Sequence, residues 1–301
     1  MLLKNRPLKT LATLRARGAA TAAAVWTPPV HMCSDLDGCS ADSGVMMPTS
    51  VHWRNAARNS IGEVDVRLPH PAWSKAEREA VGVEHTKPET LVDRAAYSTI
   101  WVLRRVFDLA TGYTFGVKDE ACMIRRVVFL ETVAAVPGMV GAALRHLKSL
   151  RRMRNDYGFI HSLLEEAENE RMHLMTALLL HEPSKIVRAA VIAAQALFLA
   201  WYTTMYALSP RFCHRLVGYL EEEAVKTYTH LLHLQDTGKL PGFDIPAPRA
   251  ARAYWNLPDD ASLREVWDCI RADEAHHREV NHTFADLTAV PNAVNPFPPG
   301  Y

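Results

Sequence analysis

Apolar residues recur in alternating steps of three and four along much of the chain after residue 90. This spacing places them on one face of a helix. The helices that we expect cover 91–113, a segment around Glu131, a segment that ends near 181–183, 189–210, a segment around Glu221, and 262–287. The pattern therefore predicts an all-α protein.

The helix predicted at 262–287 carries charge on the face that should be apolar. Its core-facing stripe contains Leu263, Trp267, Ile270, Glu274, His277, Asn281 and Phe284. A buried, unpaired carboxylate costs on the order of several kcal/mol, and a bound metal ion would offset that cost. Asp273 and His276 have the same spacing as Glu274 and His277 and compete as a ligand pair. The stripe favours Glu274 and His277.

A second Glu-x-x-His pair, Glu170 and His173, lies on another apolar stripe, which contains Leu163, Ala167, Leu174 and Ala177. A four-helix bundle with a di-iron or di-manganese centre has one Glu on each of two helices and Glu-x-x-His on each of the other two. The sequence should therefore contain two more inward carboxylates.

Glu131 is the first of these. It is the one charged residue between Arg126 and Arg145, on a stripe that contains Ile124, Val127, Ala134, Gly138 and Gly141. Pro137 should kink this helix. The small residues Gly138, Gly141 and Ala142 would let another helix approach closely.

Glu221 is the second, chosen by periodicity from three consecutive acids. Its stripe contains Val217, Glu221, Ala224, Tyr228 and Leu231, so Glu222 and Glu223 should turn toward solvent or lie behind the ligands. Tyr228 lies two turns from Glu221 on the same face. This spacing fits a core tyrosine with a satisfied hydroxyl, and it also puts the phenol beside the metals.

The resulting order is Glu, Glu-x-x-His, Glu, Glu-x-x-His, which predicts a ferritin-like four-helix bundle with a di-iron centre. A bundle with buried salt bridges would need inward cations, and none is visible on these stripes. Carboxylates with two imidazoles suit iron or manganese better than copper or structural zinc. Iron is the metal that activates dioxygen at such a centre.

Two further helices are expected at a membrane interface. Arg104, Arg105 and Asp108 interrupt the apolar residues of 91–113, as in an amphipathic interfacial helix. Residues 189–210 carry no charge and are long enough to span a bilayer. A span would separate Glu131 and Glu170 from the ligands that follow it. We therefore expect this helix to lie in or on the membrane and to connect the two halves of the bundle.

The ends of the chain differ from its helical part. Residues 1–34 contain five basic residues, Lys4, Arg6, Lys9, Arg15 and Arg17, and no acidic one. This is typical of a mitochondrial presequence. The alternatives are a disordered basic tail and, as a weaker interpretation, a secretory signal. We expect 35–87 to be an irregular extension, 88–290 the helical domain, and 291–301 a C-terminal tail. A net charge of +1 argues against a nucleic-acid binder.

The metal-ligand motifs resemble those of the alternative oxidases, the cyanide-insensitive ubiquinol oxidases of the mitochondrial inner membrane. The resemblance extends from about residue 91 to 287 and rests on Leu130-Glu-Thr132, Asn169-Glu-Arg-Met-His-Leu174, Leu220-Glu-Glu-Glu-Ala224 and Arg271-Ala-Asp-Glu-Ala-His-His277. It implies a homodimeric enzyme bound to membrane lipid on the matrix side. Such an enzyme oxidises ubiquinol and reduces dioxygen to water without pumping protons.

The resemblance also implies roles for individual residues. Two iron ions would be bound by Glu131, Glu170, His173, Glu221, Glu274 and His277, with Tyr228 beside them. Positions that bind quinol or its inhibitor analogues correspond to Arg126, Leu130, Ala224 and Thr227. Asn169 and Asp273 match positions that orient the ligands. Another ferritin-like di-iron protein, either an oxygenase or an iron-storage ferroxidase, would share the ligand set.

If residues 1–34 are a presequence, their fusion to a reporter should send the reporter to mitochondria, because basic, acid-free leaders direct import. Fluorescence microscopy with a mitochondrial marker measures this. A cytosolic reporter would defeat the prediction, and a fusion with the five basic residues changed to glutamine is the matched control.

Overall fold

The computed structural model describes residues 69–115 and 118–299, and the structural statements below refer to these residues. All of them belong to the compact unit Val66–Tyr301. The predicted presequence and residues 35–68, with Cys33 and Cys39, lie outside the described residues.

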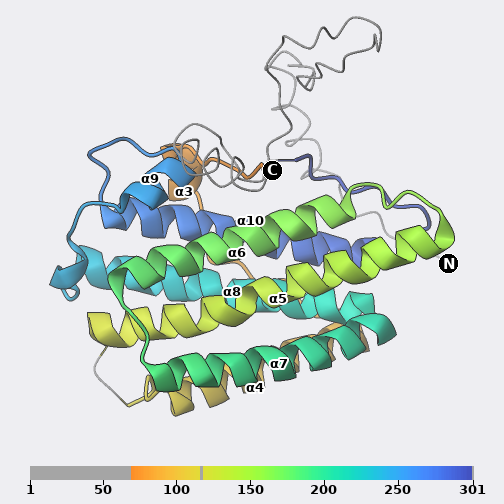
Figure 1. Cartoon of the computed structure of the whole chain (residues 1–301), viewed down its shortest axis with the longest axis horizontal. Helices are drawn as coiled ribbons and strands as arrows, with labels where there is room; N and C mark the ends of the chain where they lie inside the picture. Colours follow the sequence, from red (N-terminus) through yellow and green to blue (C-terminus); the bar gives the residue numbers. More distant parts are fainter. Residues whose placement is uncertain (1–68, 116–117, 300–301) are drawn as a thin grey trace, which may run out of the picture. The chain divides into compact units, whose positions relative to one another are not determined.

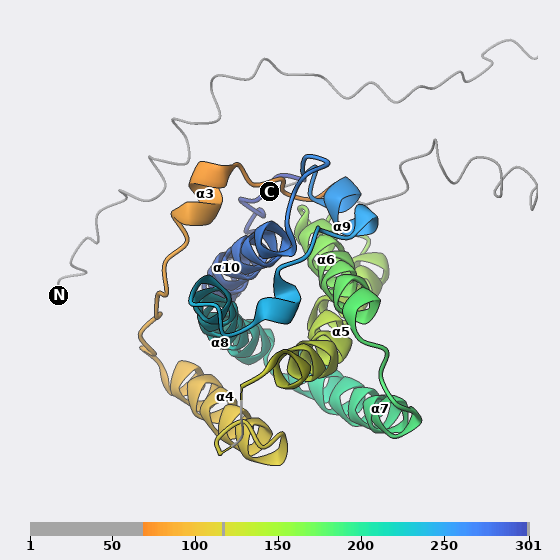
Figure 2. The ribbon, with the colours of Figure 1, turned by 90° about the vertical axis from the view of Figure 1, so that its left-hand side faces the viewer.

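Four long helices lie side by side and form a bundle (Figure 1). They are α5 (Glu120–Arg152), α6 (Phe159–Leu180), α8 (Pro210–Asp236) and α10 (Leu263–Leu287). The closest pairs are α5 with α6 and α8 with α10. Helices α4 (Leu91–Ala110) and α7 (Lys185–Leu208) lie along one side of the bundle, away from the short helices α3 (Lys75–Glu79) and α9 (Arg249–Tyr254) (Figure 2). The predicted all-α fold is confirmed.

The helix boundaries follow from local capping. Thr90 and Asp93 form a capping box at the start of α4, and Ser262 and Glu265 form another at the start of α10. Each box pairs two backbone N–H groups that the first turn of a helix leaves without partners. Pro210 occupies the first turn of α8, directly after the cap residue Ser209 that also ends α7. A proline is tolerated there because its missing N–H has no partner in that turn.

The small residues of α5 make room for α6, as the sequence predicts. A Cβ atom on Gly138 would lie 2.5 Å from the backbone oxygen of Leu163, and one on Gly141 would lie 3.2 Å from Cδ1 of Leu163. Only glycine fits at the first contact. Helix α5 continues through Pro137 to Arg152.

Helices α4 and α7 expose apolar side chains on the same side of the bundle. On α7 only Tyr202 and Tyr206 are buried. The exposed large apolar residues of the two helices are Leu91, Tyr97, Trp101, Val102, Leu103, Val106, Leu109, Ile186, Ile192, Leu197, Leu199, Trp201 and Leu208.

By length and composition, α5 and α7 could each cross a membrane. Helix α5 instead lies inside the bundle, with Glu131 buried. Helix α7 connects the first pair of bundle helices to the second, and the two pairs share one core. A bilayer crossing by α7 would separate them.

The polar centre lies between apolar layers. Helix α5 contributes Met123, Ile124 and Val127 to one apolar cluster and Ala142 to another, and Glu131 lies between them in sequence. Helix α10 repeats this arrangement, with Trp267 on one side of Glu274 and Phe284 on the other. Carboxylates on both helices are thereby held at the same level of the core.

Two segments without a sequence period also contact the bundle. Residues 69–87 contain α3, and Arg78 of this helix donates to the backbone oxygen of Glu265 at 3.2 Å. Near the C-terminus, Asn295 donates to the backbone oxygen of Gly158 and to the Ser162 hydroxyl. Both segments therefore pack on their own chain.

Gly138→Ala should destabilise the protein, because the added methyl group collides with backbone rather than with a flexible side chain. Overpacking costs about 1–3 kcal/mol, which outweighs the gain of roughly 1 kcal/mol in helix propensity from Gly to Ala. Thermal or urea unfolding measures the change. The exposed Ala143→Ser on the same helix is the control, expected within about 0.5 kcal/mol of the parent. Equal stability of Gly138→Ala and the parent would contradict the close crossing.

Candidate metal centre

Three bundle helices bring four buried metal-ligating side chains together. These are Glu131 on α5, Glu170 and His173 on α6, and Glu274 on α10. Each offers one ligand atom, and these atoms all lie within 4.8 Å of one another. Nδ1 of His173 lies 3.3 Å from Glu274 Oε1 and 3.6 Å from Glu131 Oε2.

The other two predicted ligands adjoin this group. Nδ1 of His277 lies 2.8 Å from Glu170 Oε1 and 3.7 Å from Glu274 Oε2. Glu221 of α8 is buried beside them, and this burial, together with the charges of Glu274 and Glu170, raises the pKa of its carboxyl group. The structure thus brings all six predicted side chains to one place. Helices α6 and α10 each contribute a Glu and a His, and α5 and α8 each contribute one Glu.

The atoms that face one another in this group lack hydrogen-bond partners. They are Glu131 Oε2, both carboxylate oxygens of Glu170, His173 Nδ1, Glu274 Oε2 and His277 Nδ1. The short approach of His277 to Glu170 does not have hydrogen-bond geometry. Buried polar atoms are almost always paired, so a cluster of unpaired atoms aimed at one point fits a metal site.

A bundle held by buried salt bridges would require cations here. In the described part of the chain, no lysine or arginine forms an ion pair with Glu131, Glu170, Glu221 or Glu274. Carboxylate oxygens with imidazole nitrogens are donors that suit Fe and Mn ions. The residues present therefore fit a metal centre.

Electrostatics at the site favour a cation. Burial, together with the charge of Glu170, raises the pKa of Glu131 well above its usual value. Burial and the neighbouring Glu274 do the same to the pKa of Glu221. A carboxyl group with a raised pKa keeps its proton at neutral pH unless another positive charge replaces it. Metal ions can fill that role for several carboxylates at once.

The outer nitrogen of His173 is held by Asp273. Nε2 of His173 lies 3.1 Å from Asp273 Oδ2, an arrangement that leaves Nδ1 turned toward the carboxylates. Asp273 in turn accepts hydrogen bonds from the Asn169 amide and from the Trp73 and Trp255 indoles. Partners of this kind fix the tautomer and orientation of a ligating histidine.

The competing pair of the sequence analysis lies outside the cluster. Asp273 contacts the far side of His173. His276 packs against the rings of Trp73 and Phe297, at 5.5 and 5.6 Å between centroids. Glu274 and His277, which the helical stripe favours, face the cluster instead.

Tyr228 lies beside the cluster. Its hydroxyl donates to Glu131 Oε1 at 2.6 Å, and its ring stacks on Trp267 at 6.1 Å between centroids. Burial, followed by the charge of Glu131, raises the pKa of Tyr228 well above its usual value. The phenol is neutral and tied directly to a candidate ligand.

Comparison with known proteins connects this geometry to a family. The sequence profile of the alternative oxidases matches residues 73–286 of the chain. The chain belongs to the alternative oxidase family. The match starts at Trp73, earlier than the resemblance read from the motifs, and so includes α3.

Individual members share much of this length. The mitochondrial alternative oxidase of Trypanosoma brucei brucei is 50% identical over 229 residues, 75% of this chain and 70% of the relative. That of Emericella nidulans is 46% identical over 249 residues, 79% of this chain and 70% of the relative. A protein of Mangifera indica named mitochondrial ubiquinol oxidase is 47% identical over 220 residues, 72% of this chain and 66% of the relative.

The family's candidate quinol residues lie toward α4. Arg126 of α5 donates to Asp108 and to the Thr111 hydroxyl. Its guanidinium stacks on the ring of Tyr113 at 3.9 Å and on that of Phe107 at 4.4 Å from the centroids.

Thr227 of α8 accepts from Arg104 of α4 at 2.9 Å. Leu130 and Ala224 are partly buried on α5 and α8.

Arg104 and Asp108 of α4 connect Thr227 to Arg126. From the sequence alone they were interpreted only as interruptions of an apolar helix. Arg104 donates to Asp108 at 3.0 Å, so Thr227, Arg104, Asp108 and Arg126 form one chain of polar contacts across three helices. Arg104 and Asp108 are four residues apart on one face of the helix. This spacing was the signal in the sequence from which their contact could have been predicted. A pocket of about 190 Å³ adjoins Arg126 and is also lined by Thr111, Phe129 and Val187.

The choice between adjacent histidines can be tested by metal content. His277→Ala removes a nitrogen that faces the carboxylates, so the purified variant should lose bound metal by roughly tenfold or more. His276→Ala, on the adjacent face, should retain the parent's metal content. Elemental analysis after dialysis measures both, and the reverse result would show that the helical phase is wrong.

Proposed function

We propose that this chain is a ubiquinol oxidase that reduces dioxygen to water, with no coupled pumping of protons, at a non-haem centre of two iron ions. The proposed iron ligands are Glu131, Glu170, His173, Glu221, Glu274 and His277. The buried cluster of unpaired carboxylate and imidazole atoms is the observation that supports this most strongly. The names of relatives in the same family support the substrate.

Charge balance supports two ions. Four carboxylates in one buried place require about four positive charges, which two divalent ions supply, and oxygen and nitrogen donors suit iron. When bound, the iron pair supplies the redox chemistry by which electrons from ubiquinol reach dioxygen. Two ubiquinol molecules provide the four electrons and four protons that convert one dioxygen into two water molecules.

Tyr228 is placed to take part in electron supply. A two-iron centre holds only two electrons within easy reach, and an oxidisable phenol beside it can provide another until a second quinol arrives. The Tyr228 hydroxyl already donates to Glu131 Oε1. Loss of an electron from the ring can therefore be accompanied by transfer of its proton to that carboxylate.

Arg126 and Thr227 are placed to hold the quinol head. Arg126 is buried at the side of the bundle that carries α4, and its guanidinium can donate to a quinol oxygen. Leu130 and Ala224 would supply apolar contacts. Because the exposed apolar faces of α4 and α7 lie on this side, a quinol dissolved in lipid would reach these residues without crossing water.

The same two faces support interfacial binding at the matrix side of the mitochondrial inner membrane. An amphipathic helix that lies in the interface exposes its apolar side chains to lipid, as α4 and α7 do. Relatives named mitochondrial support the compartment. A bundle that lies on one side of the bilayer gives protons no route across it, which fits an oxidase that does not pump.

A homodimer is supported by exposed apolar side chains on α5 and α6. They are Met139, Leu147, Leu150, Leu164, Met175 and Leu179. These residues lie on the two helices that precede α7. Contact with a second copy would remove them from water.

Oxygen uptake by the purified, iron-loaded protein tests the function. Ubiquinol should drive uptake that continues in the presence of cyanide, with water rather than peroxide as product. Ferrous iron oxidation without ubiquinol-dependent uptake would instead indicate an iron-storage ferroxidase. Insertion of oxygen into an added substrate would indicate an oxygenase.

Tyr228→Phe should keep its iron but lose nearly all turnover, on the order of a hundredfold or more if the phenol supplies an electron. Removal of one hydroxyl alters packing little, because the ring and its contact with Trp267 remain. Oxygen uptake and iron content are measured on the same sample. Tyr206→Phe, at a buried tyrosine whose hydroxyl contacts His214 instead, is the matched control. Near-normal uptake by Tyr228→Phe at full iron content would remove the tyrosine from the mechanism.

A further inference from the structure

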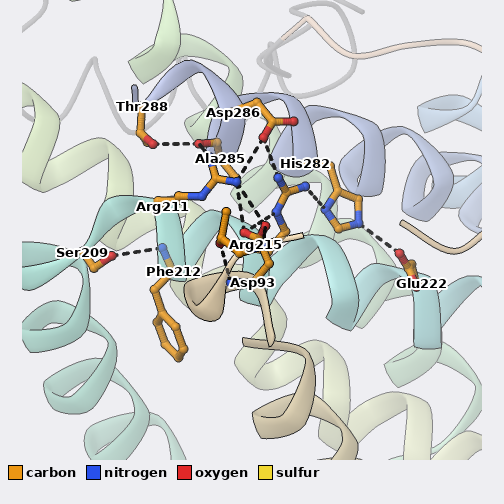
Figure 3. Close-up of polar contacts among 11 residues, drawn as sticks. Asp93, Ser209, Arg211, Phe212, Arg215, Glu222, His282, Ala285, Asp286 and Thr288 are labelled. Atoms are coloured by element: carbon orange, nitrogen blue, oxygen red, sulfur yellow. Dashed lines mark hydrogen bonds and ion pairs between the residues drawn. The ribbon is translucent and has the colours of Figure 1, made fainter. Parts of the chain in front are cut away.

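Glu222 lies directly behind the proposed ligand Glu221 and is held from several sides. It is buried on α8 and faces α10 and residues 85–86. The Thr86 backbone N–H donates to its Oε1 at 2.8 Å, and His85 Nδ1 lies 2.7 Å from its Oε2. His282 Nε2 of α10 lies 3.1 Å from its Oε1 (Figure 3). The side chain of Glu222 therefore has a fixed position.

The tautomer of His282 follows from its other neighbour. Its Nδ1 lies 3.0 Å from a terminal nitrogen of Arg215. A guanidinium has donors and no acceptor, so Nδ1 must accept and carries no proton. Nε2 then carries the proton and donates to Glu222. His282 thus connects Arg215 to Glu222 by two directed hydrogen bonds.

Arg215 is itself fixed by two carboxylates from other helices. Its Nε donates to Asp93 of α4 at 3.2 Å, and a terminal nitrogen donates to Asp286 of α10 at 2.6 Å (Figure 3). Asp93 also accepts from Arg211. The buried Arg215 cannot turn away from His282 without breaking ion pairs with both helices.

A glycine on α8 makes room for this histidine. A Cβ atom on Gly218 would lie 2.6 Å from both Cε1 and Nδ1 of His282. Gly218 is one helical turn before Glu222, so the ring rests on the α8 backbone between Arg215 and Glu222. A histidine that merely filled space would not need its ring against the backbone and a specific partner on each nitrogen.

Glu221 depends on this anchorage. The charges of Glu274 and Glu170 repel its carboxylate, and it is not among the four residues whose ligand atoms lie within 4.8 Å of one another. Its placement is therefore set by the rotation of α8 about its own axis. The adjacent Glu222, about 100° further around the helix, is held by α10 and by residues 85–86, and these contacts restrict that rotation.

We propose that Arg215, His282 and Glu222 are positioning residues that fix the rotation of α8 and hold Glu221 at the metal centre. Gly218 leaves the space that the histidine ring occupies. This inference rests on the proposed metal centre and extends it. The same series of polar contacts includes Asp93 of α4, so it connects that helix to the proposed metal ligand Glu221.

The test uses five variants of the full chain, with metal affinity as the main readout. Outer residues that orient ligands typically change metal affinity by about ten- to a hundredfold. We expect His282→Leu and Gly218→Ala each to weaken metal retention against a chelator by about that factor. In His282→Gln the side-chain oxygen can accept from Arg215 and the amide can donate to Glu222, so this variant should recover most of the parent's affinity.

The double variant Gly218→Ala/His282→Ala tests whether the two substitutions weaken metal binding through the same contact or independently. Once the ring is absent, the added methyl group has no collision partner, so the loss should be no greater than that of His282→Ala alone. Multiplied losses would overturn the proposal, and so would equal metal affinity of His282→Leu and the parent. The electron paramagnetic resonance spectrum of the half-reduced centre should change in His282→Leu and recover in His282→Gln.

Stability separates positioning from general packing. If His282→Gln and His282→Leu unfold at the same temperature yet differ in metal affinity, the directed hydrogen bonds are responsible; equal affinities at equal stability would overturn the proposal. These readouts do not involve ubiquinol. A parent protein that binds two metals but oxidises no quinol would refute the proposed function and leave this inference standing, whereas a parent that binds no metal would refute both.

Discussion

The burial of four carboxylates in one place is the constraint on which the rest of the structure depends. Like charges in a medium of low polarity repel strongly, and here both burial and neighbouring acids raise the pKa values of Glu131 and Glu221. Such a group is stable only if protons or metal ions balance it. The helices that carry it must therefore be packed closely enough to exclude water and firmly enough to keep the ligands aligned.

Two devices provide that alignment. Close helix contact at Gly138 fixes α5 against α6, which together carry three of the clustered ligands. Directed polar contacts fix the remaining elements: Asp273 orients His173, and the contacts of Glu222 orient α8. The apolar core sets where the helices lie, while the polar contacts set how far each one is rotated.

The clustering of these acidic and histidine side chains could be predicted from sequence because helical periodicity is a local property. Glu274 rather than Asp273, and Glu221 rather than Glu222, follow from positions three and four residues away. Contacts that join distant segments carry no such signal. The indole of Trp73 reaches Asp273 from 200 residues away, and the position of Glu222 depends on His85 and His282, so the stripe alone left its environment open. The short helices α3 and α9 were missed for the same reason: packing against α10 and α6, not an internal period, accounts for their place in the fold.

The order of the ligands along the chain has a consequence for biosynthesis. Glu131, Glu170 and His173 are made before α7, whereas Glu274 and His277 are on α10, the last long helix to be made. Until α10 has joined the bundle, Glu131, Glu170 and His173 lack Glu274 and His277, so the proposed metal centre is incomplete. Because metal binding stabilises the folded state, the centre distinguishes complete chains from truncated ones. A protein interrupted before α10 keeps the exposed apolar side chains of α4 and α7 but lacks Glu274 and His277, two of the six proposed ligands.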